Sequence, residues 1–394
     1  MGNIWNIKDR YKAVMNHEIR GDRGIWSGGI DPAVNTIDFA EISSLGNAAD
    51  FGDLKGNRYY HSACGNSTRY IAMAGVAPAD ASTNDVEYVQ FATKGNGAFF
   101  SDATVENREM TGLSNETRGI SAGGASPYIN VIEYITIASV GTDGADFGDL
   151  AANTGYMGGF ASPTRGVFIG GNPGSSPNEL NVIQYITIAT TGNTTDFGDL
   201  TTTVSNTRGA SSSVRGVRMG GYTSPGRTVT CDHVTIASTG DATDFGDLTQ
   251  ARANPGCTSN ATRAIAAGGN TPTIVNTMDY ITIASTGDAA DFGDLTVSLH
   301  HHEGSSNGHG GINQDVLQRP SVTYMPGSGR ALFGGGIQPA SSNVIDFITT
   351  STLGNAVDFG NLRFNRYYHT AFASSIRFFS MAGVDGTGAT AHTD

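Results

Sequence analysis

A five-residue string, Asp-Phe-Gly-Asp-Leu, recurs along the chain and constrains its fold more than any other feature. It occurs at 50–54, 146–150, 196–200, 244–248 and 291–295, with variants at 99–103 (FFSDA) and 358–362 (DFGNL). The last residues of these seven copies are 49, 47, 50, 48, 47 and 67 residues apart. A period near 48 residues indicates a repeat architecture, in which one supersecondary unit is copied along the chain.

A second marker keeps the same register. An arginine lies fifteen residues after the end of six of the seven copies: Arg69, Arg118, Arg165, Arg215, Arg263 and Arg377. In the remaining copy the interval is 35 residues, from Leu295 to Arg330, which predicts a 20-residue insertion within about 299–328. Arg23 opens an eighth run of the same kind, RGIWSGG.

The segments between the markers are typical of strands. Runs such as NVIQYITIA (181–189) are rich in Ile, Val, Tyr and Thr and are too short for typical helices. Val182, Ile186 and Ile188 share one face of this run, and Ile183 and Tyr185 share the other, so both faces are expected to be packed. Four strands per repeat of about 48 residues fit a propeller blade, so we predict an all-β, seven-bladed β-propeller. A right-handed β-helix is the alternative, although its coils are usually about half this length.

The repeat resembles the kelch motif. The match is clearest in NRYYHSACGNSTRYIAMAGV (57–76) and NRYYHTAFASSIRFFSMAGV (365–384), and Arg58, His61 and Tyr88 lie where that motif has Arg, His and Tyr. The sequence departs from the motif where kelch blades carry Trp, because here the Phe of the DFGDL string takes that place. Kelch phasing implies that 363–377 completes the blade begun by 25–54. It leaves 378–384 as a surplus strand, which would add to that blade or pair with another subunit.

The amino-acid sequence of the repeat, as in YITIASTGDAADFGDL (280–295), also resembles that of propeller-type repeat proteins of tailed phages, especially phages of aquatic bacteria and cyanobacteria. This resemblance implies a virion protein: a tail or head fibre, a spike or a decoration subunit. The implied localisation is therefore the virion, with synthesis in the host cytoplasm. A homo-oligomer or a larger assembly is expected.

The distribution of charge limits the partners. The formal net charge is −13, and five Lys or Arg against three Asp or Glu give residues 1–24 a charge of +2, which leaves −15 for the rest. A body this acidic repels nucleic acid and anionic membranes, so neither is an expected ligand. The chain has no run of 18 apolar residues, and its first residues lack the apolar core of a signal peptide.

Residues 1–24 are expected to lie outside the propeller, which would occupy 25–394. Apolar side chains at helical spacing suggest that this segment docks on other virion proteins. The expected docking residues are Ile4, Trp5, Ile7, Tyr11 and Val14. The alternative is a helix that folds back against the propeller itself.

The repeated carboxylates are interpreted as scaffold, because a catalytic site needs one unique constellation. In this interpretation each Asp of the string accepts backbone N–H bonds at a corner or pairs with a repeated Arg such as Arg165. Calcium binding and acid–base catalysis are the alternatives. The repeat residues meant are Asp146, Phe147, Asp149, Arg165, Asp196, Phe197, Asp199 and Arg215.

The one unusual polar cluster lies in the expected insertion. It contains His300, His301, Glu303 and His309, while His302 matches His61 in its repeat and is expected to be a blade residue. A transition metal is an alternative ligand, but alternating side-chain directions in an extended chain limit how many residues share one ion. We expect no cofactor and no metal. Further residues expected to bind a partner are Asn313, Gln314 and Tyr324.

These observations favour a non-enzymatic structural or attachment protein that uses propeller loops to bind a host-surface glycan or protein, or another subunit. A secreted or cell-surface carbohydrate-binding adhesin is the alternative. Kelch-like propellers also include copper-radical oxidases, and Cys64 lies near Tyr59 and Tyr60, but the further ligands of such a centre do not assemble in this sequence.

Overall fold

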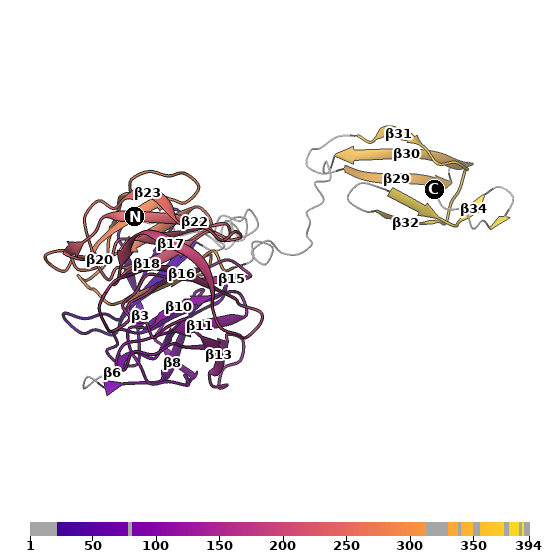
Figure 1. Cartoon of the computed structure of the whole chain (residues 1–394). Coiled ribbons are helices and arrows are strands. Elements are labelled where there is room, and N and C mark those ends of the chain that lie inside the picture. Colours follow the sequence, from indigo (N-terminus) through magenta and orange to yellow (C-terminus); the bar gives the residue numbers. More distant parts are fainter. Residues whose placement is uncertain are drawn as a thin grey trace. The chain divides into compact units, whose positions relative to one another are not determined.

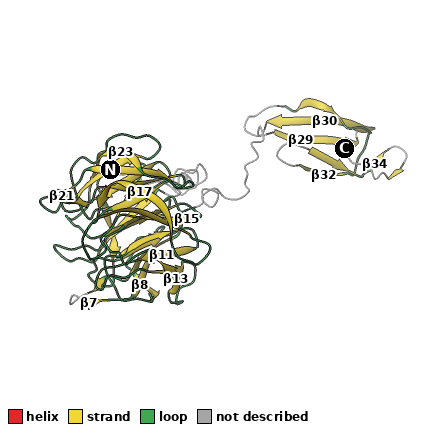
Figure 2. Cartoon of the chain, viewed as in Figure 1, coloured by secondary structure: helices red, strands yellow, loops and turns green. Residues whose placement is uncertain are grey.

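The computed structural model describes residues 22–77, 81–312, 330–337, 340–349, 355–373, 378–385 and 388–389. The regular elements in these ranges are all β-strands, so the predicted all-β class is confirmed for this part of the chain (Figure 2). Contacts divide the chain into two compact units, residues 1–318 and 319–394, which we call unit 1 and unit 2 and describe separately. No helix in the described ranges is long and apolar enough to cross a membrane.

Unit 1 contains six four-stranded antiparallel sheets, which we call blades 1 to 6 (Figure 1). Blade 1 consists of β28 (Glu303–Ser306), β1 (Arg23–Ser27), β2 (Thr36–Glu41) and β3 (Ala49–Asp53). Blade 2 consists of β4 (Ser62–Gly65), β5 (Arg69–Met73), β8 (Asp85–Gln90) and β9 (Ala98–Asp102). Blade 3 consists of β10 (Thr111–Ser114), β11 (Arg118–Ala122), β12 (Val131–Thr136) and β13 (Ala145–Asp149).

The remaining blades repeat this order. Blade 4 consists of β14 (Gly158–Ala161), β15 (Arg165–Ile169), β16 (Leu180–Thr187) and β17 (Thr195–Val204). Blade 5 consists of β18 (Arg208–Ser211), β19 (Arg215–Met219), β22 (Thr230–Thr235) and β23 (Thr243–Asp247). Blade 6 consists of β24 (Gly256–Ser259), β25 (Arg263–Ala267), β26 (Thr277–Thr282) and β27 (Ala290–Asp294). Two small hairpins, β6 (Val76–Ala77) with β7 (Ala81–Ser82) and β20 (Tyr222–Thr223) with β21 (Gly226–Arg227), extend blade loops.

The first strands of the blades meet one another in sequence. Contacts join β4 to β10, β10 to β14, β14 to β18, β18 to β24, β24 to β28, and β28 back to β4. Each sheet is open by itself, but the six first strands therefore form a complete circuit. This arrangement is β-propeller-like.

The prediction of seven blades is not confirmed. Blade 1 receives its first strand from β28, which pairs with β1 from Gly24↔Ser306 to Ser27↔Glu303, and not from 363–377. Part of the expected insertion is thus the strand that completes blade 1, and residues 313–329 lie outside the described ranges. The DFGNL copy at 358–362 belongs to unit 2.

The repeated arginines hold each blade to the next one. Each of them opens the second strand of its blade and donates a hydrogen bond from Nη1 to a carbonyl just after the third strand of the following blade, at 2.5 to 3.2 Å. The donor–acceptor pairs are Arg23–Phe91, Arg69–Ile137, Arg118–Ile188, Arg165–Ile236, Arg215–Ile283 and Arg263–Ile42. The last pair joins blade 6 to blade 1.

The DFGDL string forms the outer strand of each blade and pairs with a turn of the next blade. The Phe197 carbonyl accepts from Gly240 N at 2.7 Å, and the Asp199 N–H donates to Asp241 Oδ1 at 3.0 Å. Gly198 has a φ of 144°, and a Cβ there would lie 2.5 Å from the Gly240 carbonyl oxygen, so the motif requires glycine at this close approach. The turn of the next blade thus covers the outer strand, whose edge would otherwise be open.

Of the two roles expected for the repeated Asp, backbone hydrogen bonding at a corner or pairing with a repeated Arg, the second is not seen for Arg165 among the described residues. The Arg165 guanidinium instead lies over the Tyr185 ring, 4.6 Å from its centroid, and Asp146 is exposed. The motif uses its backbone for contacts between blades, which leaves its first carboxylate free to face solvent. Its phenylalanine is buried: Phe147, 2% exposed, packs edge-on against Tyr134 with ring centroids 6.0 Å apart.

Unit 2 contains a three-stranded sheet of β29 (Arg330–Ile337), β30 (Ser341–Thr349) and β31 (Val357–Asn361). The predicted surplus strand corresponds to β33 (Phe378–Met381), which pairs with β32 (Thr370–Ala373), and β34 (Val384–Asp385) pairs with β35 (Gly388–Ala389). The order of strands repeats the start of unit 1. Positions that are buried in unit 1 are exposed here: Phe333 is 56% and Phe359 is 55% exposed, whereas the matching Trp26 and Phe51 are each 2% exposed.

The expected N-terminal anchor falls mostly outside the described residues, which begin at Asp22. The docking role of Ile4, Trp5, Ile7, Tyr11 and Val14 therefore stays a prediction. Arg23 and Gly24, expected in the anchor, belong instead to β1 of blade 1. We also expected one propeller over 25–394, whereas this range is divided between the two units.

Candidate binding site at the lip of unit 1

Six residues form a ring at the start of the first strands, and we call this ring the lip. Each lies two residues before a first strand and has a positive φ of 51° to 58°. The lip residues are Tyr60, Glu109, Tyr156, Asn206, Asn254 and His301. Positive φ is uncommon for residues other than glycine and concentrates at functional positions.

Backbone hydrogen bonds link the lip into a closed circuit. Each N–H donates to the carbonyl of the preceding lip residue, as Glu109 N does to Tyr60 O at 2.9 Å, and Tyr60 N completes the circuit by donating to His301 O at 3.2 Å. The backbone groups thereby hold the strained conformation. The six side chains are of four kinds, Tyr, Glu, Asn and His, and the backbone circuit leaves them available for a specific role.

Glu109 is the most unusual side chain of the lip. It is 2% exposed, and neither carboxylate oxygen has a hydrogen-bond partner. His301 Nδ1 lies 3.1 Å from Glu109 Oε1, but without hydrogen-bond geometry. These two residues come from different sides of Tyr60 in the ring, so their side chains point inward to meet. A buried carboxylate without partners is costly and is uncommon in folded proteins.

A buried ion pair lies just inside the lip. Arg208 and Glu303 are the first residues of β18 and β28, and Arg208 Nε donates to Glu303 Oε1. Arg208 also donates from Nη1 to the carbonyls of Met157 and Thr207, at 3.3 and 2.9 Å. Burial raises the pKa of Glu303 above its ordinary value, although the adjacent guanidinium opposes this shift.

Aromatic rings surround these charges. Tyr60 packs edge-on against His301 with ring centroids 4.3 Å apart. The ring centroids of Tyr156 and Tyr128 are 6.4 Å apart. Burial, with the Glu109 carboxylate as a second cause, raises the pKa of Tyr128 and of Tyr156. Both tyrosines are half-buried. The lip thus combines a carboxylate with aromatic faces.

The predicted polar cluster is divided between the two ends of the first strands. His301 and Glu303 lie at the lip, and His300 Nε2 lies 3.0 Å from the exposed Asp31 carboxylate. His309 lies at the opposite end of the first strands. Asn313, Gln314 and Tyr324 lie outside the described residues. Within the described ranges, no group of three His, Cys, Asp or Glu side chains is placed to hold a metal ion.

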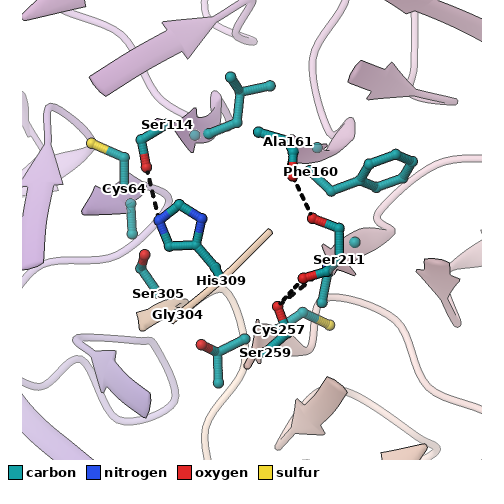
Figure 3. A pocket seen from close by; sticks show the side chains of 17 residues that line it. Cys64, Ser114, Phe160, Ala161, Ser211, Cys257, Ser259, Gly304, Ser305 and His309 are labelled. Carbon is teal, nitrogen blue, oxygen red and sulfur yellow. Dashed lines mark hydrogen bonds between the residues drawn. The ribbon is translucent and has the colours of Figure 1, made fainter. Parts of the chain in front are cut away.

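At that opposite end, residues 307–312 cross the circuit of first strands, and we call this segment the plug. His309 Nε2 lies 3.2 Å from Ser114 Oγ in blade 3 (Figure 3). It also lies 2.9 Å from Gly65 O in blade 2, while His309 Nδ1 accepts from Gly311 N at 3.1 Å. A small cavity lies between the first strands and is lined by His309, Cys64 and Cys257 among others (Figure 3). The plug therefore covers one end of this cavity.

Sequence reasoning missed Glu109 and Arg208, although a signal for both existed. In the aligned repeats, the column that holds Glu109 contains Tyr, Glu, Tyr, Asn, Asn and His, so Glu109 is its single carboxylate. Two positions further on, the column contains Ser, Thr, Gly, Arg, Gly and Glu, so its two charged members are of opposite sign. The available signal was therefore a charged side chain in a column where most repeats carry uncharged ones.

Comparisons with known proteins support the architecture alone. No protein-family model matches the chain, and no curated protein matches it. One similar solved structure, titled "Structure of YjhT", has a TM-score of 0.53 at 10% sequence identity and covers 69% of this chain and 97% of its own. At this identity the likeness concerns the fold: the chain is similar to YjhT in its β-propeller-like arrangement of four-stranded sheets.

Proposed function

We propose that this chain is a non-enzymatic structural and attachment protein of a phage virion. In this proposal unit 1 is a closed, six-bladed, kelch-like propeller, and its lip binds a host-surface group or a neighbouring subunit. The amino-acid sequence of the repeat resembles that of tailed-phage propeller proteins, and this resemblance motivates the assignment to a virion.

One observation carries the binding role: residues that repeat hold blades together, and residues that do not repeat gather at the lip. Arg165 and the backbone of the DFGDL strings are committed to contacts between blades. Glu109 and His301 stand at one matched position of the repeat yet differ in chemistry. A rigid scaffold with variable groups at one end is the usual layout of a binding protein.

The proposal favours binding over the oxidase alternative for a structural reason. Cys64, which lies close to Tyr59 and Tyr60 in sequence, is buried with its Sγ 3.9 Å from Met73 Sδ. Tyr60 instead packs against His301 at the lip. The cysteine and the lip tyrosine thus have different surroundings.

Mass spectrometry and immunogold labelling of purified phage particles test the virion assignment. The protein is expected in stoichiometric amounts on the particle surface, and its absence from particles would overturn the assignment. Particles that carry Glu109→Gln should adsorb to host cells more slowly than particles that carry Glu106→Gln, an exposed residue three positions earlier. Equal adsorption of the two would argue against an attachment role for the lip.

A further inference from the structure

The Glu109 carboxylate has no hydrogen-bond partner among the described residues of unit 1, although His301 Nδ1 lies 3.1 Å from its Oε1. Both of its oxygens are buried without a hydrogen-bond partner. Leaving a buried charged acceptor unsatisfied costs more than leaving a neutral one, so such a group is expected to have a partner in the functional state.

The arginine side chains near Glu109 already donate hydrogen bonds to other groups. Arg208 donates to Glu303 and to two backbone carbonyls. Arg108, next to Glu109 in sequence, donates from Nη2 to Ser126 Oγ at 3.0 Å on the exposed surface. Burial lowers the pKa of His300, which favours its neutral form at neutral pH. His301 Nδ1, 3.1 Å from Glu109 Oε1, is close enough for an ion pair but makes no hydrogen bond, so no described side chain at the lip hydrogen-bonds to Glu109.

The balance of charge at the lip is negative. Arg208 and Glu303 cancel each other when both are ionised, which leaves the Glu109 carboxylate with the His301 imidazole, 3.1 Å from its Oε1, as its near neighbour. The exposed Asp31 carboxylate beside His300 adds to the negative field at the rim. A field of this sign attracts a cation and repels an anion.

The unpartnered groups of the lip are mostly acceptors. Besides the two oxygens of Glu109, Asn254 Oδ1 is buried without a partner. Tyr60 and Tyr156 flank Glu109 in the lip circuit and supply aromatic rings, which attract cations through their faces. A neutral polyol would satisfy the acceptors but leave the charge unpaired.

We propose that the lip binds an organic cation with several N–H donors, an ammonium or guanidinium group, on the Glu109 carboxylate. This inference rests on the proposed binding role of the lip, but not on the assignment to a virion. The group could belong to a lysine or arginine of a partner protein or to a free amine, because either presents the same chemistry.

Isothermal titration of the full chain at pH 8 tests the proposal, since lysine-type amines remain protonated there. The probes are n-butylammonium, ethylguanidinium, a lysine-containing tripeptide blocked at both ends, and methyl α-glucoside as the neutral polyol. At least one cation should bind saturably. Glu109→Gln should weaken that binding at least about tenfold, because it removes a hydrogen bond to a charged group. The exposed control Glu106→Gln should leave it unchanged.

Asn254→Asp supplies an independent test of opposite sign, because a second carboxylate at the lip should strengthen cation binding. Circular dichroism checks that each variant is folded. Tighter binding of the peptide than of the free amine would identify a protein side chain as the ligand, and the reverse would identify a free amine. Absence of saturable cation binding, cation binding unaffected by Glu109→Gln, or stronger binding of the glucoside would overturn the proposal, whatever the outcome of the particle experiments.

Discussion

Thr296 donates hydrogen bonds from its backbone N–H and its hydroxyl to the carboxylate of Asp38, at 2.9 and 2.7 Å, across 258 residues of sequence. Thr296 follows the DFGDL string of blade 6, and Asp38 lies in the third strand of blade 1. The same bond joins Lys55 to Glu87 between blades 1 and 2, and Thr249 to Asp279 between blades 5 and 6. The contact between blades 6 and 1, which closes the circuit, therefore uses the same hydrogen bond as the contacts between consecutive blades.

Replacing Asp38 with Ala should weaken that closing contact. The change removes the buried carboxylate that accepts both hydrogen bonds from the exposed Thr296, so we expect a loss of about 0.5–1.5 kcal/mol in the free energy of unfolding. Denaturant titration followed by tryptophan fluorescence measures the effect, because Trp26 is buried in blade 1. Asp346 occupies the same place in its repeat within unit 2, and Asp346→Ala should leave the unfolding of unit 1 unchanged. Equal losses for the two variants would contradict the closing role of Asp38.

Removing residues 319–394 should leave unit 1 folded. The first strands of its six blades already contact one another in a complete circuit, and every described strand of these blades comes from unit 1. The truncated protein is expected to unfold cooperatively at nearly the melting temperature of unit 1 in the full chain, as measured by calorimetry. Loss of cooperative unfolding would show that unit 1 depends on the removed repeat.

The sequence was informative about contacts that repeat and uninformative about the number of blades. The fifteen-residue interval that ends at Arg165 reflects a real constraint, because the arginine opens a second strand and bonds to the next blade. A blade has the same local sequence whether the ring closes after six copies or seven. Closure depends on the angle between neighbouring blades and on which strand joins β1. That strand, β28, carries only four residues, EGSS, inside a stretch that resembles an insertion.

The candidate site was partly predictable for a related reason. His301 and Glu303 were visible because they belong to a conspicuous histidine cluster in the sequence. Glu109 and Arg208 are far apart in the sequence and belong to no such cluster. They come from blades 3 and 5, and the circuit of first strands brings them to the same end of unit 1. A site whose residues come from distant repeats cannot be recognised from their positions in the sequence, because they approach one another only in the folded structure.

Acidification should destabilise the plug through His309. Burial of the imidazole lowers the pKa of His309 to about 4, although the hydrogen bond with the Gly65 carbonyl opposes this shift. A folded-state pKa below the ordinary value near 6.5 means that stability is present above pH 6.5 and is lost as the pH falls towards 4. We expect a loss of about 2–3 kcal/mol from this residue over that range.

The comparison of wild type with His309→Gln isolates this effect. Glu303, whose pKa is raised, has the opposite sign: its contribution is present at low pH and declines as the pH rises. That contribution is common to both proteins and cancels in the difference. Unfolding curves from pH 7 to 4 should show a shallower decline for His309→Gln, and parallel curves would refute the role of His309.

Gly311→Ala should open the end of the cavity that the plug covers. A Cβ at residue 311 would meet the carbonyl oxygen of Ser114 in blade 3, so the plug must move away from the first strands to accept it. Cys64 and Cys257 line the cavity, whereas Cys231 is buried away from it. The pKa of Cys64 and that of Cys231 are both raised to about 12 by burial, so their intrinsic reactivities are matched.

In the wild-type protein all three thiols should react slowly with a neutral alkylating reagent. In Gly311→Ala we expect faster labelling of Cys64 and Cys257, read by mass spectrometry of the digested protein, with Cys231 unchanged. Because the plug contributes no blade strand, the melting temperature should change little. If Cys231 is labelled in parallel with the other two, the substitution has loosened the blades themselves and the plug does not act as a separate cover. If no cysteine reacts faster, the cavity is closed by the first strands alone.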